Sequence, residues 1–180
     1  MESTGTQWID TGVTRIITNK YKFIGNISYS DITNRQLNGA QGYVYFGVIS
    51  GYYQITNGSY DHTDVTVTLN TFTPFEVEFD CPNNIVSYNI DGVYKTNKAV
   101  YKDVPANAHF ALFSLNNGIL PGKEKISYFQ IYDNDILVRD FIPVLDGNGT
   151  PCMYDKVEGK FYYNAGTGDF IAGPVIGSGE

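Results

Sequence analysis

The chain has 180 residues and a formal net charge of −7, and its 46 β-branched residues (17 Ile, 14 Val and 15 Thr) outnumber its seven Leu and seven Ala. Because β-branched side chains favour strands over helices, this composition excludes a helical bundle, a coiled coil and an alternating α/β enzyme of the dinucleotide-binding kind. The 12 Lys and Arg residues form no cluster and no apolar run reaches ~18 residues, so we expect neither a nucleic-acid partner nor insertion into a membrane.

Short strands separated by turns are predicted along the whole chain. Apolar and polar residues alternate in the manner of half-buried strands at 21–29, 63–69, 75–79, 125–132 and 136–144. Residues 84–96 are predicted to form a hairpin that turns at Asp91-Gly92, because this pair tolerates the positive φ angles of a tight turn. The pattern predicts an all-β fold, namely a two-sheet antiparallel β-sandwich.

The predicted sandwich occupies residues 2–173 as one domain, and we expect residues 174–180 to be a C-terminal linker or a vector-derived tail. Cys81 and Cys152 are expected to be buried free thiols, although spacing alone does not exclude a disulfide between them.

An aromatic outer face is the main candidate for ligand binding. Strand parity assigns Val44, Phe46, Val48, Tyr53 and Ile55 to the core, and Tyr43, Tyr45, Tyr52, Gln54 and Thr56 to the opposite face. A sugar ring stacks its apolar C–H face on flat aromatic rings, while amides bind its hydroxyl groups. Amides flanking these strands complete the candidate ligand-binding set: Asn38, Gln41, Asn57 and Asn116. The alternative is that other segments cover these outer-face tyrosines.

A second constellation is acidic. Glu76, Glu78 and Asp80 alternate along one predicted strand and therefore share a face. Some glycoside hydrolases with a jelly-roll fold use a Glu-x-Asp-x-Glu strand, whereas the order here is Glu-x-Glu-x-Asp. We expect these carboxylates to form a solvated outer face opposite Phe75 and Val77, and we predict no catalytic residue.

Metal sites are weakly indicated. Residues 146–150 alternate oxygen ligands as a calcium loop does at its start, but no Glu follows at the required distance. An Asp-Gly-Asn-Gly turn also forms without a metal. No cofactor is predicted, and calcium is the one ion left open.

The two ends of the chain resemble a known family. The opening ESTGTQWIDTGV (residues 2–13) and the closing stretch ISYFQIYDNDILVRDFIPVLDGNGTPCMYDKVEGKFYYNAGTGDFIAGP (residues 126–174) are similar to concanavalin A-like, or laminin-G-like, domains. Such domains occur in bacteriophage tail and baseplate proteins and in surface proteins of gut bacteria. The resemblance implies a jelly-roll sandwich, and a chain that continues upstream of Met1, but no particular ligand.

The sequence thus predicts a non-catalytic, carbohydrate-binding or receptor-binding module, whose partner is a glycan or a cell-surface polysaccharide. It is expected at a virion tail, or outside the cell at its surface, as part of a longer protein. Other subunits of a tail or surface assembly are further candidate partners. The alternatives are a structural tail or baseplate domain without ligand, and a glycoside hydrolase that uses Glu76, Glu78 and Asp80.

Overall fold

The computed structural model describes residues 1–33, 35–40, 44–56, 60–101, 108–115 and 118–174, except for the side chains of residues 35, 36 and 60–62. Within these residues the chain forms fourteen β-strands and no α-helix. The strands are β1 (Ile9–Thr14), β2 (Lys20–Tyr29), β3 (Arg35–Ala40), β4 (Val44–Ile49), β5 (Tyr52–Thr56), β6 (Tyr60–Thr66), β7 (Thr73–Asp80), β8 (Ile85–Ile90), β9 (Val93–Lys98), β10 (His109–Leu112), β11 (Glu124–Asp133), β12 (Ile136–Leu145), β13 (Pro151–Asp155) and β14 (Lys160–Tyr162).

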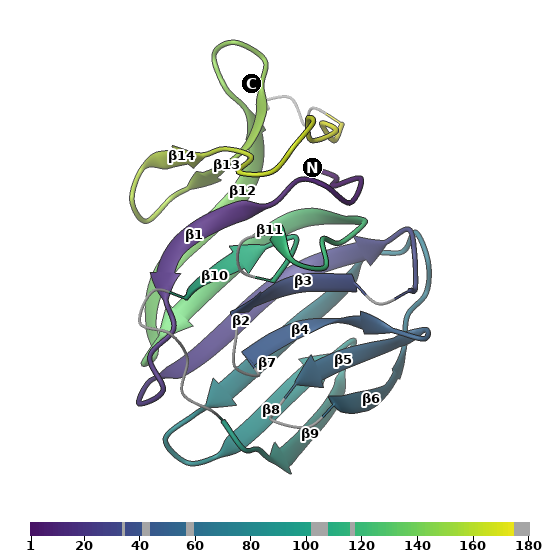
Figure 1. Ribbon diagram of the computed structural model, residues 1–180, viewed down its shortest axis with the longest axis vertical. Helices are drawn as coiled ribbons and strands as arrows, with labels where there is room; N and C mark the ends of the chain where they lie inside the picture. Colours follow the sequence, from purple (N-terminus) through teal and green to yellow (C-terminus); the bar gives the residue numbers. More distant parts are fainter. Residues whose placement is uncertain (34, 41–43, 57–59, 102–107, 116–117, 175–180) are drawn as a thin grey trace.

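The strands form two antiparallel sheets that pack face to face, which confirms the predicted sandwich. One sheet has six strands in the order β1-β10-β3-β4-β5-β6, and the other has eight in the order β14-β13-β12-β11-β2-β7-β8-β9. Figure 1 shows the six-stranded sheet in front of the larger sheet, with the β12–β14 end of the larger sheet extending beyond it. No helix in the described part of the chain is long and apolar enough to cross a membrane.

Aromatic rings fill the space between the sheets. Phe23 on β2 is fully buried, and its ring centroid lies 5.0 Å from that of Phe110, 5.8 Å from that of Phe79 and 5.9 Å from that of Phe129. Because Phe110 belongs to the other sheet, this cluster joins the two layers. Such ring pairs stabilise beyond the area they bury.

Most of the predicted strands are confirmed, with one displaced. The Asp91-Gly92 turn has φ values of 50° and 83° and joins β8 to β9 as expected. The strand predicted at 63–69 instead spans Tyr60–Thr66, so Leu69 lies beyond its end and is exposed. The pairing of β6 with β5 determines where β6 begins and ends. The alternation of residues 63–69 carries no information about this pairing.

Both cysteines are free and buried, as expected. They lie at the end of β7 and within β13, which are separated in the eight-stranded sheet by β2, β11 and β12. Burial raises the pKa of the Cys81 thiol to about 11, so this thiol stays protonated at neutral pH.

Candidate functional site

The outer face of the eight-stranded sheet carries two rows of polar side chains across β7, β8 and β9. Cross-strand partners in an antiparallel sheet project to the same side. Val77 and Phe79 are buried in the core, so Glu76 and Glu78 project outward. The register then defines the rows Glu76–Asn89–Tyr94 and Glu78–Ser87–Thr96.

These rows surround a shallow depression, which we call the carboxylate hollow. It has a volume of about 120 Å³ and is lined by Glu76, Glu78, Ser87, Tyr88, Asn89 and Tyr94. Carboxylates accept hydrogen bonds, whereas hydroxyl and amide groups both donate and accept them. The hollow therefore offers every kind of polar partner that a sugar hydroxyl group needs.

Tyr94 supplies the aromatic surface of the hollow. Its side chain is 68% exposed, and its hydroxyl group lies 3.0 Å from Thr96 Oγ1. The contact with Thr96 fixes the polar end of the ring while leaving most of its surface in contact with water. A large exposed ring beside convergent polar groups is a favourable arrangement for binding a partly apolar ring such as a sugar.

The three acidic residues of β7 do not act as one group. Glu76 is exposed, and the half-buried Glu78 lies 3.8 Å from Lys20 Nζ. Asp80 instead accepts hydrogen bonds from the backbone N–H and the side-chain amide of Asn83, at 2.8–3.2 Å. Asp80 is thus held in the β7–β8 turn, and only the two glutamates line the hollow.

The aromatic face predicted from the sequence lies on the other sheet and is partly covered. Val44, Phe46, Val48, Tyr53 and Ile55 are buried in the core as predicted. On the opposite side Tyr52 is 41% exposed and Tyr45 is half-buried. A Cβ on Gly39, which pairs with Tyr45, would lie 2.6 Å from Leu115 Cδ2, so Leu115 covers this part of the face.

Neither of the two predicted amides in the described part of the chain, Asn38 and Gln54, is exposed. Asn38 pairs with the core residue Phe46, is fully buried and donates a hydrogen bond to Ala111 O at 3.1 Å. A register shift in β3 between residues 36 and 38 turns its side chain into the sandwich. Gln54 does lie on the outer side of β5, opposite Gly47, but is only 1% exposed. Four other predicted residues lie outside the described part of the chain: Gln41, Tyr43, Asn57 and Asn116.

The possible calcium loop is a self-sufficient turn. Asp146 Oδ1 accepts hydrogen bonds from the backbone N–H groups of Asn148 and Thr150, at 2.8 and 2.9 Å, and Oδ2 accepts one from the Tyr163 hydroxyl group at 3.1 Å. These bonds, that of Thr150 foremost, lower the pKa of the Asp146 carboxyl group. Among the described residues, no cluster of three or more His, Cys, Asp or Glu is placed to hold a metal.

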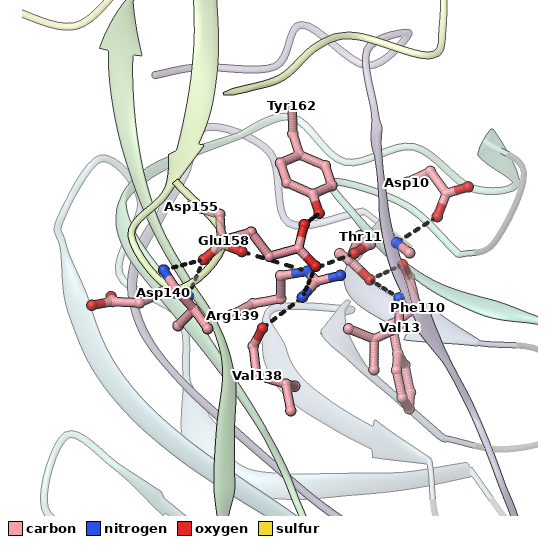
Figure 2. Close-up of polar contacts among 12 residues, drawn as sticks. Asp10, Thr11, Val13, Phe110, Val138, Arg139, Asp140, Asp155, Glu158 and Tyr162 are labelled. Atoms are coloured by element: carbon pink, nitrogen blue, oxygen red, sulfur yellow. Dashed lines mark hydrogen bonds and ion pairs between the residues drawn. The ribbon is translucent and has the colours of Figure 1, made fainter. Parts of the chain in front are cut away.

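A partly buried ion-pair network fixes the far end of the same sheet (Figure 2). The Arg139 guanidinium lies 2.8 Å from Glu158 Oε1 and 3.7 Å from the fully buried Asp155, and it donates a hydrogen bond to Thr11 O at 2.9 Å. Tyr162 donates a hydrogen bond to Glu158 Oε2 at 2.6 Å, and burial raises the pKa of Tyr162 to about 12. The network joins β12, β13 and β14 to β1, and we assign it a structural role.

No model of a known protein family matches the sequence, and no curated protein matches it. Its fold matches that of a proposed carbohydrate-binding protein from Bacteroides ovatus, with a TM-score of 0.61 at 11% identity over 98% of this chain and 60% of that one. This chain therefore spans about three-fifths of that protein's length.

Weaker structural matches include a domain of an arabinanase and an alginate lyase. Domain 4 of the extracellular arabinanase AbnA from Geobacillus stearothermophilus, solved with arabinotriose, gives a TM-score of 0.44 at 16% identity over 68% of this chain and 63% of that one. An alginate lyase of polysaccharide lyase family 7, AlgAT5, gives 0.41 at 11% identity over 64% and 59%. The fold of this chain, a two-sheet jelly-roll β-sandwich, is similar to that of the Bacteroides ovatus protein.

Proposed function

We propose that the protein is a non-catalytic module that binds a glycan on the outer face of its eight-stranded sheet, at the carboxylate hollow. The observation that carries this proposal is the 68% exposed ring of Tyr94 beside a depression lined by two carboxylates, an amide and a hydroxyl group. Stacking on the ring and hydrogen bonding along the rows match the two kinds of surface of a sugar. The fold shared with a proposed carbohydrate-binding protein supports the same proposal.

Two acidic side chains in the hollow also restrict the ligand. Lys20 lies closer to Asp135, at 2.8 Å, than to Glu78, at 3.8 Å. Lys22, which pairs with Glu78 across the sheet, lies over the ring of Tyr132, and Lys95 is paired with Asp64. A negatively charged hollow on a chain of net charge −7 repels uronic and sialic acids. The proposed ligand is therefore a neutral glycan.

Replacing Tyr94 with alanine is expected to weaken glycan binding by about 1–3 kcal/mol, the scale seen when aromatic side chains stack on flat partners. Stability should change little, since an exposed edge-strand residue contributes little to the core. Isothermal titration with the best neutral oligosaccharide of a glycan array measures the first quantity, and thermal unfolding measures the second.

Tyr52→Ala is the matched variant on the opposite sheet, where the sequence alone predicts the aromatic platform. The proposal expects this variant to bind as the wild type does. If Tyr52→Ala loses affinity and Tyr94→Ala keeps it, the ligand binds on the six-stranded sheet. If the wild type binds no glycan below millimolar concentration, a structural tail or baseplate domain is the better description.

Glycoside hydrolysis is the second candidate function, because Glu76 and Glu78 line one hollow. Alternate residues on a strand lie about 6.6–7 Å apart along the chain, while paired carboxyl groups in these enzymes are about 5–9.5 Å apart. We expect no release of reducing sugars by the wild type, and we expect the Glu76→Gln, Glu78→Gln double variant to keep the fold. Hydrolysis by the wild type that disappears in the double variant would establish the enzyme instead.

We further propose that the module works within a longer protein, on a virion tail or at a cell surface. The resemblance of its two ends to domains of such proteins supports this location. Monovalent binding of the expected strength would be effective there, because several copies on one particle raise the effective concentration.

A further inference from the structure

A second depression lies on the same pair of strands, and we call it the amide hollow. It has a volume of about 410 Å³ and is lined by Asn83, Asn84, Ile85, Thr96, Asn97, Lys98 and Ala99. These residues come from the β7–β8 turn, the start of β8 and the end of β9. None of the residues predicted from the sequence as a ligand contact belongs to it.

The chemistry of the amide hollow suits a chain of hydroxyl groups. Each asparagine offers a carbonyl acceptor and two N–H donors. The Asn83 amide is held by Asp80, to which it donates at 2.8 and 3.0 Å, and Asn84 is exposed. Asn97 pairs with the buried Val86, so its side chain faces the other side of the sheet. Ile85, which is 36% exposed, adds an apolar patch between these amides. The hollow therefore combines amide groups, one of which is held in place, with an exposed apolar side chain.

The two hollows lie in line along β8 and β9. Tyr94 pairs with Asn89 at the carboxylate hollow, and Lys98 pairs with Ile85 at the amide hollow. The Ser87–Thr96 pair lies between them on the outer face, and Thr96 is a wall of the amide hollow that also contacts the Tyr94 hydroxyl group. Tyr94 and Lys98 are four positions apart on β9, which corresponds to about 13 Å.

We propose that the amide hollow is a second subsite for the same glycan, which would lie as a linear, neutral oligosaccharide parallel to β8 and β9. This inference rests on the proposed function, because Tyr94 anchors one end of the chain. Sugars beyond Tyr94 bind through the amides of Asn83 and Asn84 and over Ile85. A disaccharide at Tyr94 does not reach these groups, so affinity rises with chain length.

The test compares a disaccharide with a hexasaccharide of one neutral homopolymer, chosen from cello-, xylo-, manno- and arabino-oligosaccharides by binding to the wild type. The subsite variant is Asn83→Ala with Asn84→Gly, and glycine is used at position 84 because Asn84 has a φ of 54° that glycine adopts without strain. Two lost hydrogen-bonding amides correspond to roughly tenfold in affinity. Phe161→Ala, with a 42% exposed ring on the distant strand β14, is the control.

The wild type is expected to bind the hexasaccharide at least about tenfold more tightly than the disaccharide, and the subsite variant to lose this gain while binding the disaccharide unchanged. Phe161→Ala should match the wild type for both ligands, and unfolding temperatures verify that each variant folds. Equal affinity of the wild type for both ligands, or an undiminished gain in the subsite variant, overturns the second subsite. Different outcomes would contradict the proposed function itself. These are that the wild type binds neither ligand, or that the Tyr94→Ala variant binds both ligands as tightly as the wild type does.

Discussion

Replacing Arg139 with methionine is expected to lower the free energy of unfolding by about 3–5 kcal/mol, the cost of removing one partner from a buried ion pair. The variant leaves the fully buried Asp155 carboxylate without its cation and the carbonyl of Thr11 without its donor. Asp155 keeps two backbone N–H donors, from Asp140 and Val157, which places the expected loss toward the lower end of this range. Chemical denaturation with urea measures the change.

Lys156→Met is the matched control for this prediction. Lys156 Nζ lies 2.7 Å from Asp140 Oδ2, but its side chain is 49% exposed. Water screens such a pair, so its removal is expected to cost at most about 1 kcal/mol. Equal losses in the two variants would show that the Arg139 network is no more than a surface ion pair.

Replacing Phe23 with alanine is expected to lower the free energy of unfolding by about 3–5 kcal/mol, the usual cost of truncating a buried phenylalanine. The ring contacts Phe79, Phe110 and Phe129 and therefore joins the two sheets. The cavity left by the substitution adds to the lost burial, because close-packed neighbours relax only partially. The same urea titration measures this loss.

Phe23→Leu separates the cavity from the loss of the aromatic contacts, since leucine refills part of the volume. It should cost clearly less than the alanine variant, because the cost of a core substitution follows the volume left empty. A loss below about 1 kcal/mol for Phe23→Ala would mean that Phe23 does not join the two sheets.

Local patterns predict the fold well where a strand is regular and half-buried. The alternation in residues 21–29 assigns Tyr21, Phe23, Ile27 and Tyr29 to the core, and all four are fully buried. Alternation fails where a register shift intervenes, because one extra residue reverses which side each later side chain faces. Asn38, which is expected from the sequence as an amide flanking the strands, instead follows such a shift within β3 and faces the core.

The burial of Gln54 illustrates a second limit of the sequence. Parity places this residue correctly on the outer side of β5, but parity does not reveal that the outer side is covered. Leu115 lies over Gly39 on that face from 76 residues further along the chain. Contacts between segments so far apart depend on the tertiary fold, which no local pattern reports.

The sequence contains the information that places the residues of the carboxylate hollow side by side, although no local pattern singles them out as a site. A two-residue Asp91-Gly92 turn fixes the register of a hairpin, and this register places Tyr94 opposite Asn89. The pairing of β7 with β8, which brings Glu76 beside Asn89, has the same origin in a short turn. Sequence patterns alone do not select Tyr94, because an exposed tyrosine on a hairpin indicates a binding site only when its neighbours across the strands are known.

The most direct test of glycan binding on the eight-stranded sheet is a nuclear magnetic resonance titration of the isotopically labelled protein. Its ligand is the neutral oligosaccharide that the wild type binds best. We predict that the largest shifts in backbone amide signals occur at Ser87, Asn89, Tyr94 and Thr96, with Tyr45 and Tyr52 unaffected. Shifts confined to Tyr45 and Tyr52, or the absence of shifts at millimolar ligand, would contradict the account.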